Sequence, residues 1–176
     1  MKSNRWLTIA ALAALPLLAA STNGTKPLDV TERVRHELVM LPNLGVFDNL
    51  AFRVEGGRVT LFGAVVRPVL KSSAERVVAA IPGVTGVENR IEVLPLSRFD
   101  DQARFGVFRA VYSWPGLDRL AWQALPPVRI IVKNGHVALE GVVANEMDRN
   151  AAYVRALAVP GVFSVENHLT VERASR

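Results

Sequence analysis

Two hydrophobic patterns alternate along this chain, one with the period of a strand and one with the period of a helix. From Leu50 to Val54 every second residue is apolar, and the alternation resumes from Val59 to Val65. Gly56-Gly57 separates these runs, and such a dipeptide tolerates the positive φ angles of a two-residue hairpin turn. The pattern therefore predicts two antiparallel strands joined by a tight turn.

Helical spacing precedes and follows this hairpin. Asp29 is a candidate N-cap for a first helix that ends at Pro42, and Pro68 fits the first turn of a second helix. The expected buried positions of these helices are Val30, Val34, Leu38, Leu41, Leu70, Ala74, Val77, Val78 and Ile81. Pro82-Gly83 ends the second helix, and a last strand follows with Val87, Asn89, Ile91 and Val93 on one face.

Residues 54–93 return at a shift of 78 residues as residues 132–171, without a gap. Identical residues include Gly63 and Gly141, and Asn89 and Asn167. The repetition predicts an α+β fold of two tandem αββαβ repeats, each a three-stranded mixed sheet with two helices on one face. The expected boundaries are residues 28–95 for the first domain, 96–99 for a linker and 100–173 for the second domain.

The second copy has its own local signals. Asp101 is the expected cap of its first helix, Asn134-Gly135 forms its hairpin, and Asn145 caps its second helix together with Asp148. Phe105, Phe108, Val111 and Tyr112 are the expected buried stripe of the first helix. The connection from Leu117 to Pro127 is longer than its counterpart in the first copy. Outer-face residues expected to join the two copies are Phe62, Ile131 and Val142.

The repeated strand glycines and asparagines have structural and functional interpretations. Gly63 and Gly141 interrupt apolar strand faces, and we expect a helix backbone to approach closely there, since neither belongs to a phosphate-binding loop. Asn89 and Asn167 stand on a core face, where an amide needs hydrogen-bond partners. We expect them to tie a loop backbone in place; a catalytic use is the alternative.

Residues 1–21 have the order of a secretory signal peptide. Lys2 and Arg5 precede an apolar run from Trp6 to Ala20, and we expect cleavage after Ser21. The alternative is a membrane-anchoring helix, but the run is shorter than the roughly 20 residues that span a bilayer. Residues 22–27 form a polar lead. The chain is therefore expected in the periplasm, and without cysteine it has no lipid anchor of the N-terminal cysteine type.

Charge and motifs narrow the functional classes. The formal net charge of +5 is spread among acids rather than gathered in a stripe, so nucleic-acid binding is not expected. The chain lacks the common nucleophile, zinc-protease and nucleotide-binding motifs. His136 and His168 stand where the first copy has Arg58 and Arg90. Positions that hold either arginine or histidine are typically exposed to solvent on the outer side of a strand. We therefore expect no catalysis, no cofactor and no metal.

The hairpin with its strand glycine, followed by PGVTGVENRIEV and PGVFSVENHLTV, resembles the BON-domain family over nearly the whole chain after the leader. It is most similar to paired-BON proteins of the bacterial envelope, including osmotically inducible periplasmic proteins. The resemblance implies a non-catalytic protein that binds phospholipid at anionic membrane surfaces. Some paired-BON relatives are lipoproteins, which this cysteine-free chain does not match.

Two functional hypotheses follow. The first is peripheral binding to anionic phospholipid membranes in stress protection or envelope maintenance, with Arg104 as a further basic residue. Its candidate lipid-binding residues are Arg109, Trp114, Leu117, Arg119, Trp122 and Arg129. For each tryptophan, core packing under the long connection is the alternative. The second hypothesis is a protein-interaction or chaperone-like module that binds envelope proteins through its sheet faces and edges.

Overall fold

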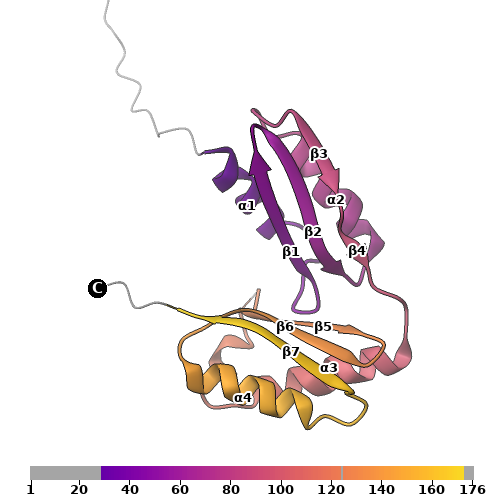
Figure 1. The fold of residues 1–176 in the computed structure, drawn as a ribbon, viewed down its shortest axis with the longest axis vertical. Helices are drawn as coiled ribbons and strands as arrows, with labels where there is room; N and C mark the ends of the chain where they lie inside the picture. Colours follow the sequence, from indigo (N-terminus) through magenta and orange to yellow (C-terminus); the bar gives the residue numbers. More distant parts are fainter. Residues whose placement is uncertain (1–28, 124, 173–176) are drawn as a thin grey trace, which may run out of the picture.

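The computed structural model describes residues 29–123 and 125–172, and in these ranges helices and strands follow the same order twice (Figure 1). Repeat one contains α1 (Val30–Val39), β1 (Asn49–Glu55), β2 (Arg58–Val65), α2 (Pro68–Ala79), β3 (Gly86–Asn89) and β4 (Glu92–Val93). Repeat two contains α3 (Arg98–Tyr112), the short 3-10 helix η1 (Asp118–Leu120), β5 (Val128–Lys133), β6 (His136–Val143), α4 (Glu146–Leu157) and β7 (Ser164–Val171). The predicted signal peptide and polar lead lie outside the described residues.

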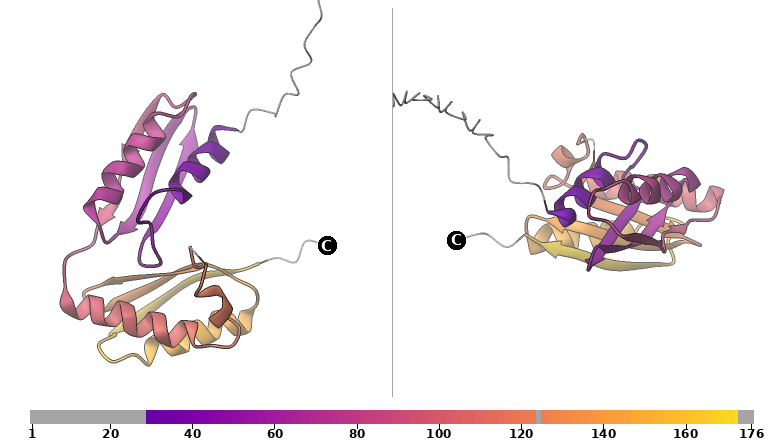
Figure 2. Two further views of the ribbon diagram at one scale, coloured as in Figure 1. Left: turned by 180° about the vertical axis from the view of Figure 1, so that it is seen from behind. Right: turned by 90° about the horizontal axis from the view of Figure 1, so that it is seen from above.

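Each repeat forms a mixed sheet of its own. β1 and β5 pair antiparallel with β2 and β6, while β3 and β7 pair parallel with the same two central strands. Leu61 pairs with Asn89 and Leu139 with Asn167, so the register also repeats at a shift of 78 residues. The two helices of each repeat lie together on one face of its sheet (Figure 2). The fold is thus the expected α+β class with two mixed sheets.

The last strand of repeat one differs from the expected single strand. It is split into β3 and β4, both of which pair with β2, whereas β7 is continuous. Between the two pieces the amide of Arg90 donates to the carbonyl of Leu61 at 2.8 Å, which keeps the interrupted segment attached to the sheet. The first sheet consequently has four strands and the second has three.

Turns and caps follow the sequence in part. Gly56, Gly57, Asn134 and Gly135 all have positive φ, as the hairpin prediction requires. The Asn145 side chain accepts from the amide of Asp148 at 2.8 Å, confirming that cap. Other helix starts differ: no side-chain cap bond forms at the start of α1, and α3 is capped by Ser97 instead of Asp101.

Two separate cores lie between sheets and helices. The first gathers side chains of α1, α2 and the sheet around Val34, Leu61 and Leu70; the second is built around Val107, Ile130 and Leu139. The predicted stripe of α3 is wrong at Phe105, which is exposed, because the helix instead buries Ala103, Arg104 and Val107. Among the described residues, no helix is both long and apolar enough to cross a bilayer.

The strand glycines are explained by a neighbouring strand rather than by a helix. Gly63 and Gly141 have φ values of +113° and +123°. A Cβ atom on Gly63 would overlap the carbonyl oxygen of Asn49, and one on Gly141 would overlap that of Pro127. The expected helix contact is therefore wrong: both glycines permit a kink where the hairpin strands begin to pair.

The two repeated asparagines join an edge strand to a helix. The Asn89 side-chain amide donates to the carbonyl of Lys71 at 2.9 Å, and its oxygen accepts from the amide of Ile91 at 3.2 Å. Asn167 makes the same two contacts with Arg149 and Leu169, at 3.1 and 3.2 Å. The tethered backbone belongs to a helix, not to a loop as expected, and the backbone amide two residues after each asparagine is satisfied at the same time.

The repeats meet where a loop of repeat one contacts α3 and β5, and Arg129 and Lys133 of β5 also contact repeat one. The carbonyl of Val46 accepts from the amide of Ile130 at 2.9 Å, which extends the edge of β5 by one backbone contact. Phe47 packs edge-on against Phe105 and Phe108 of α3, with ring centroids 5.3 and 6.3 Å apart. The prediction of an outer-face contact is wrong for Phe62 and Val142, which are exposed.

Candidate membrane-binding surface

Two residues of the predicted lipid site lie against the body of repeat two. The Trp114 indole donates to the carboxylate of Asp148 at 3.0 Å, and the Arg155 guanidinium lies 5.2 Å from the centre of its ring. Leu117 is fully buried in the second core. These contacts fold the beginning of the long connection inward, so Leu117 is not part of an exposed surface.

The basic residues of the predicted site divide into exposed and buried ones. Arg109 is exposed, whereas Arg104 is buried and binds Asp101 and the carbonyl of Val132. Arg129 is half-buried where the repeats meet and donates to the carbonyl of Gly45 at 3.3 Å. Burial lowers its pKa, while the nearby Tyr112 and Asp48 act in the opposite direction. Arg104 and Arg129 thus serve packing; the Arg119 side chain lies outside the described part.

Trp122 is the exposed member of the predicted site, with 92% of its surface accessible. It follows η1, within the connection that is longer than its counterpart in repeat one. The core-packing alternative therefore does not apply to Trp122, although it describes Trp114 well.

The start of α3 and the turn of the β5–β6 hairpin lie at the same end of repeat two (Figure 1), and a second exposed apolar group is found there. Leu96, Phe99 and Phe163 expose 93%, 84% and 75% of their surfaces. We call these three residues the apolar tip. Phe99 and Phe163 border a cavity of about 410 Å³ together with Gly135 and Gly161. Large exposed apolar groups that gather in this way mark interaction surfaces.

Buried polar contacts hold the apolar tip in place. The Asp100 carboxylate accepts from the amides of Asn134 and Gly135 at 3.0 and 2.8 Å, which fastens the start of α3 to the hairpin. The amide of Phe163 donates to the carbonyl of Gly135 at 2.8 Å. Repeat one has the matching bond from Thr85 to Gly57 at 2.9 Å, but a small polar side chain in place of the phenyl ring.

The solvent side of α3 continues this surface. Arg98, Phe105 and Arg109 are exposed, and Phe105 and Arg109 follow Arg98 by seven and eleven residues. At about 100° per residue these spacings place all three within about 20° of one line along the helix. The helix therefore presents two guanidinium groups and a phenyl ring along one stripe.

Sequence reasoning missed the apolar tip although one signal was visible. Phe163 replaces Thr85 inside the otherwise matching PGVxxVEN segment. A large apolar residue in a turn contributes nothing to a core face, so its presence in only one copy was informative. Leu96 and Phe99 fall in the stretch that was interpreted as a short linker.

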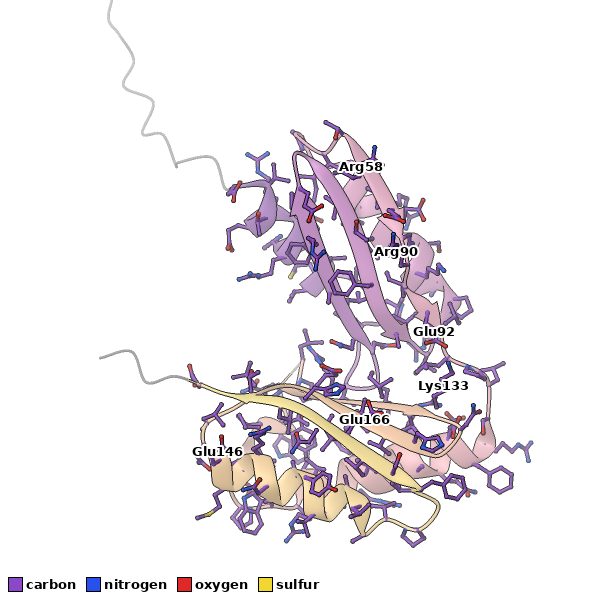
Figure 3. All side chains as sticks on the ribbon, viewed as in Figure 1. Arg58, Arg90, Glu92, Lys133, Glu146 and Glu166 are labelled. Carbon is purple, nitrogen blue, oxygen red and sulfur yellow. The ribbon has the colours of Figure 1, made fainter. Side chains whose placement is uncertain are left out.

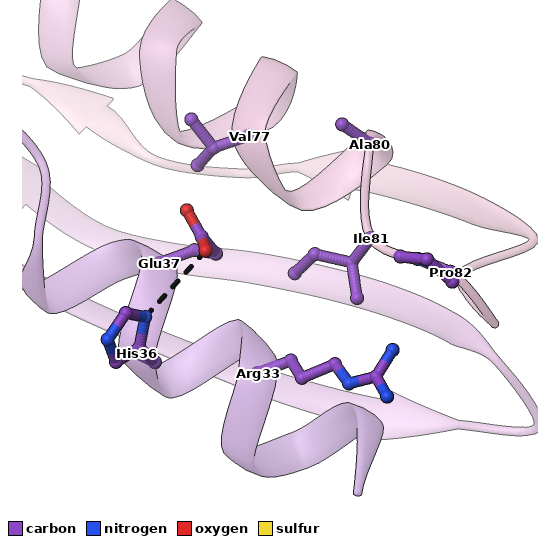
Figure 4. A pocket seen from close by; sticks show the side chains of 7 residues that line it. All are labelled: Arg33, His36, Glu37, Val77, Ala80, Ile81 and Pro82. Carbon is purple, nitrogen blue, oxygen red and sulfur yellow. Dashed lines mark ion pairs between the residues drawn. The ribbon is translucent and has the colours of Figure 1, made fainter. Parts of the chain in front are cut away.

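Two histidines, His168 and His36, each lie beside an acidic side chain. His168 lies on the outer sheet face with Nδ1 2.7 Å from Glu140, and this hydrogen bond is the main cause of its raised pKa. His36 pairs with Glu37 at 3.7 Å beside an open hollow of about 360 Å³ between α1 and α2 (Figure 4). Within the described ranges, no group of three or more histidine and acidic residues is placed to hold a metal ion.

Comparison with known proteins adds a family assignment. The model of the BON domain matches residues 28–95 and 117–173, which is more than half of the chain. No curated protein matches the chain. The second matched segment begins after α3, so the helix that carries the exposed stripe lies outside it.

Two solved structures resemble the chain over most of their length. One is the C-terminal domain of CdsD, named as the structural protein of the type III secretion system of Chlamydia trachomatis; it is 15% identical, covers 83% of this chain and 98% of its own, and has a TM-score of 0.31. Another structure of CdsD is 15% identical, covers 84% and 94%, and has a TM-score of 0.30. At these scores the likeness carries no functional argument.

Proposed function

Because the chain belongs to the BON-domain family, which indicates an envelope-associated protein without catalysis, we propose that it binds peripherally to anionic phospholipid membranes through repeat two. The observation that carries the proposal is the apolar tip: Leu96, Phe99 and Phe163 are largely exposed at one end of the domain. A bilayer interface would remove these side chains from water, which is the favourable term in peripheral attachment.

The expected attachment is weak and reversible. Full burial of a large apolar side chain contributes about 1.5–3 kcal/mol, and partial insertion of each tip residue contributes less. Each basic residue close to an anionic surface adds about 1 kcal/mol, which Arg98 and Arg109 can both supply. Because the electrostatic part is screened by salt, binding should weaken as ionic strength rises.

The long connection provides a second candidate anchor. Trp122 is exposed, and an indole ring is well suited to the headgroup layer of a bilayer. We include Trp122 and Arg119 in the proposed surface as a contact subordinate to the apolar tip. We also propose export to the periplasm under the leader of residues 1–21, and a task in envelope maintenance or stress protection.

Flotation with vesicles that contain or lack anionic lipid tests this proposal. We expect the double variant F99S/F163S to lose most of the flotation seen for the parent at low salt, because both rings leave the apolar tip. W122A/R119A is the matched variant for the long connection and should lose less. Circular dichroism of both variants controls for folding, since Phe99, Phe163 and Trp122 lie outside the cores.

Three outcomes would contradict the proposal in different ways. Equal flotation with neutral and anionic vesicles would show that anionic lipid does not contribute to binding. Unchanged flotation of F99S/F163S would remove the apolar tip from the surface. A parent protein that does not float at low salt would favour the protein-interaction hypothesis, in which sheet faces or edges bind an envelope protein.

A further inference from the structure

The sheet of repeat one turns a cationic face away from its helices. Arg53, Arg58 and Arg90 line an open hollow of about 450 Å³ on this face, together with Thr60 and Phe62. Figure 3 shows Arg58 and Arg90 on the side of the sheet opposite α1 and α2. We call this hollow the arginine face. Glu55 and Glu88 are its acidic members.

The three guanidinium groups differ in how strongly they are engaged by neighbouring acidic side chains. The Arg58 guanidinium makes no hydrogen bond or ion pair with another described residue. Arg53 reaches Glu55 only at 3.9 Å, and both side chains are mostly exposed. The Arg90 fork is held in place by Glu88, which accepts from Nε at 2.8 Å and lies 2.7 Å from Nη2. A guanidinium has five donors, so Arg90 keeps donors on Nη1 while its plane is fixed.

Strand register fixes how these groups are spaced. Arg58 is paired with Gly86 on the neighbouring strand, four residues before Arg90. At about 3.3 Å per residue, the two arginines emerge about 13 Å apart along the strand direction. Phe62 is 38% exposed and directly follows Leu61, whose carbonyl accepts from the amide of Arg90 at 2.8 Å. The face therefore suits an extended ligand with repeated negative groups better than one small anion.

The matching positions of repeat two do not form a cationic face. A shift of 78 residues replaces Arg58 and Arg90 with His136 and His168, and Phe62 with Glu140. His168 is engaged by Glu140 at 2.7 Å and by Glu166 at 3.6 Å. Lys133, which stands where repeat one has Glu55, forms an ion pair with Glu92 at 2.5 Å. Repeat two thus neutralises its outer face, and repeat one leaves guanidinium donors unused.

From these observations we infer that the arginine face binds an acidic polysaccharide. Arginine forks match the geometry of carboxylate and phosphate groups, and the spacing of Arg58 and Arg90 allows contacts with more than one sugar unit. The exposed ring of Phe62 offers an apolar surface on which the carbon face of a sugar ring can lie. An acidic peptide would use the arginines but would not need that ring. The inference does not depend on the apolar tip, which belongs to the other repeat.

Fluorescence anisotropy with labelled polygalacturonate, in the absence of lipid, tests the inference. R58A/R90A should weaken binding about tenfold or more, because charge-assisted hydrogen bonds are lost. H136A/H168A changes the matching positions of repeat two and should leave binding within about twofold of the parent, the range expected of surface changes without a lost contact. Neutral dextran should not bind, and F62A should weaken the binding of polygalacturonate more than that of polyglutamate.

Several results would overturn this assignment. Equal loss in the R58A/R90A and H136A/H168A variants would mean that general charge, not the arginine face, is responsible. Tighter binding of polyglutamate with no effect of F62A would assign the face to an acidic protein partner instead. No binding of polygalacturonate at low salt would refute a polysaccharide site, and the outcome of vesicle flotation would be unaffected.

Discussion

The two repeats have the same order of elements and the same strand register, but they fill the space between their helices differently. In repeat two, Arg155 of α4 donates to the carbonyl of Ala110 at 3.3 Å and to the hydroxyl of Ser113 at 3.1 Å. In repeat one Val77 stands at the matching position, and the hollow shown in Figure 4 remains open between α1 and α2. The same scaffold thus tolerates a bridged and an open arrangement.

This comparison separates what the scaffold requires from what each copy adds. The features present in both repeats fix the course of the backbone. They are two hairpin turns, two strand glycines and two tethering asparagines. The unpaired features are exposed side chains, namely the apolar tip of repeat two and the arginine face of repeat one. Paired residues should therefore affect stability, whereas unpaired ones should affect binding.

The largest effect is expected at the paired strand glycines. Gly63→Ala and Gly141→Ala should each destabilise the protein by about 3 kcal/mol or more, because the new Cβ overlaps a backbone carbonyl at a positive φ. Denaturant unfolding measures this. Gly56→Ala is the control for a positive φ without steric overlap, since no heavy atom beyond its chain neighbours lies within 4 Å of its Cβ position. A parent-like midpoint for either strand variant would refute the equivalence of the two sheets.

A smaller effect is expected where the repeats meet. Phe47→Ala removes the ring that packs against Phe105 and Phe108 and should cost about 2 kcal/mol, less than a fully buried phenylalanine. The loop of Phe47 should then hold the repeats together less firmly, so calorimetry should show two separated transitions. A single transition at the temperature of the parent would mean that this contact does not couple the repeats.

The tethering asparagines should show an effect of about 1–2 kcal/mol each. Asn89→Ala and Asn167→Ala leave the backbone amides of Ile91 and Leu169 without their partner and remove one of the bonds to a helix carbonyl. Hydrogen exchange at Ile91 and Leu169 should become faster in the matching variant only. If exchange at both sites stays slow, water or a neighbouring group replaces the side chain, and the asparagines do not protect the strand edge.

The smallest effect concerns His168, whose counterpart in repeat one is an arginine. The pKa of His168 is raised above its ordinary value, mainly by its hydrogen bond with Glu140. A raised folded-state pKa stabilises the protein fully below about pH 6.5, and this contribution is lost as pH rises through the folded pKa. NMR titration of His168 should show the elevation, and Glu140→Gln should remove most of it. An unshifted parent titration would contradict this contact.

The periodicity and the internal repeat predicted most of the fold. The hairpins, the strand faces and the mixed sheets depend on local patterns that the sequence displays directly, such as Gly56-Gly57 and the alternation around Leu61. The cap of α3 and the exposure of Phe105 were predicted wrongly. The exposure of Phe105 depends on tertiary contacts, because α3 instead buries Arg104 through bonds to Asp101 and Val132. The cap is a local choice between candidates, and the Ser97 side chain accepts from the amide of Asp100.

The surface was less predictable than the cores. Trp114 and Trp122 occur in the same connection, and the sequence alone does not distinguish them. Trp114 contacts the carboxylate of Asp148 and the guanidinium of Arg155, which lie far from it in the sequence. Phe163 differed visibly from Thr85, yet its proximity to Phe99 depends on how α3 starts beside the hairpin. No local sequence pattern predicts that segments so far apart in the chain come into contact.

A pair of labelled cysteine variants tests the central claim most directly, because the parent has no cysteine. An environment-sensitive dye is attached at Phe163→Cys in the apolar tip, and at Thr85→Cys in the matching turn of repeat one. With anionic vesicles at low salt, the emission of the dye at position 163 should shift to the blue, and the dye at position 85 should remain in water. Equal shifts at both positions, or a shift at position 85 alone, would contradict membrane binding through repeat two.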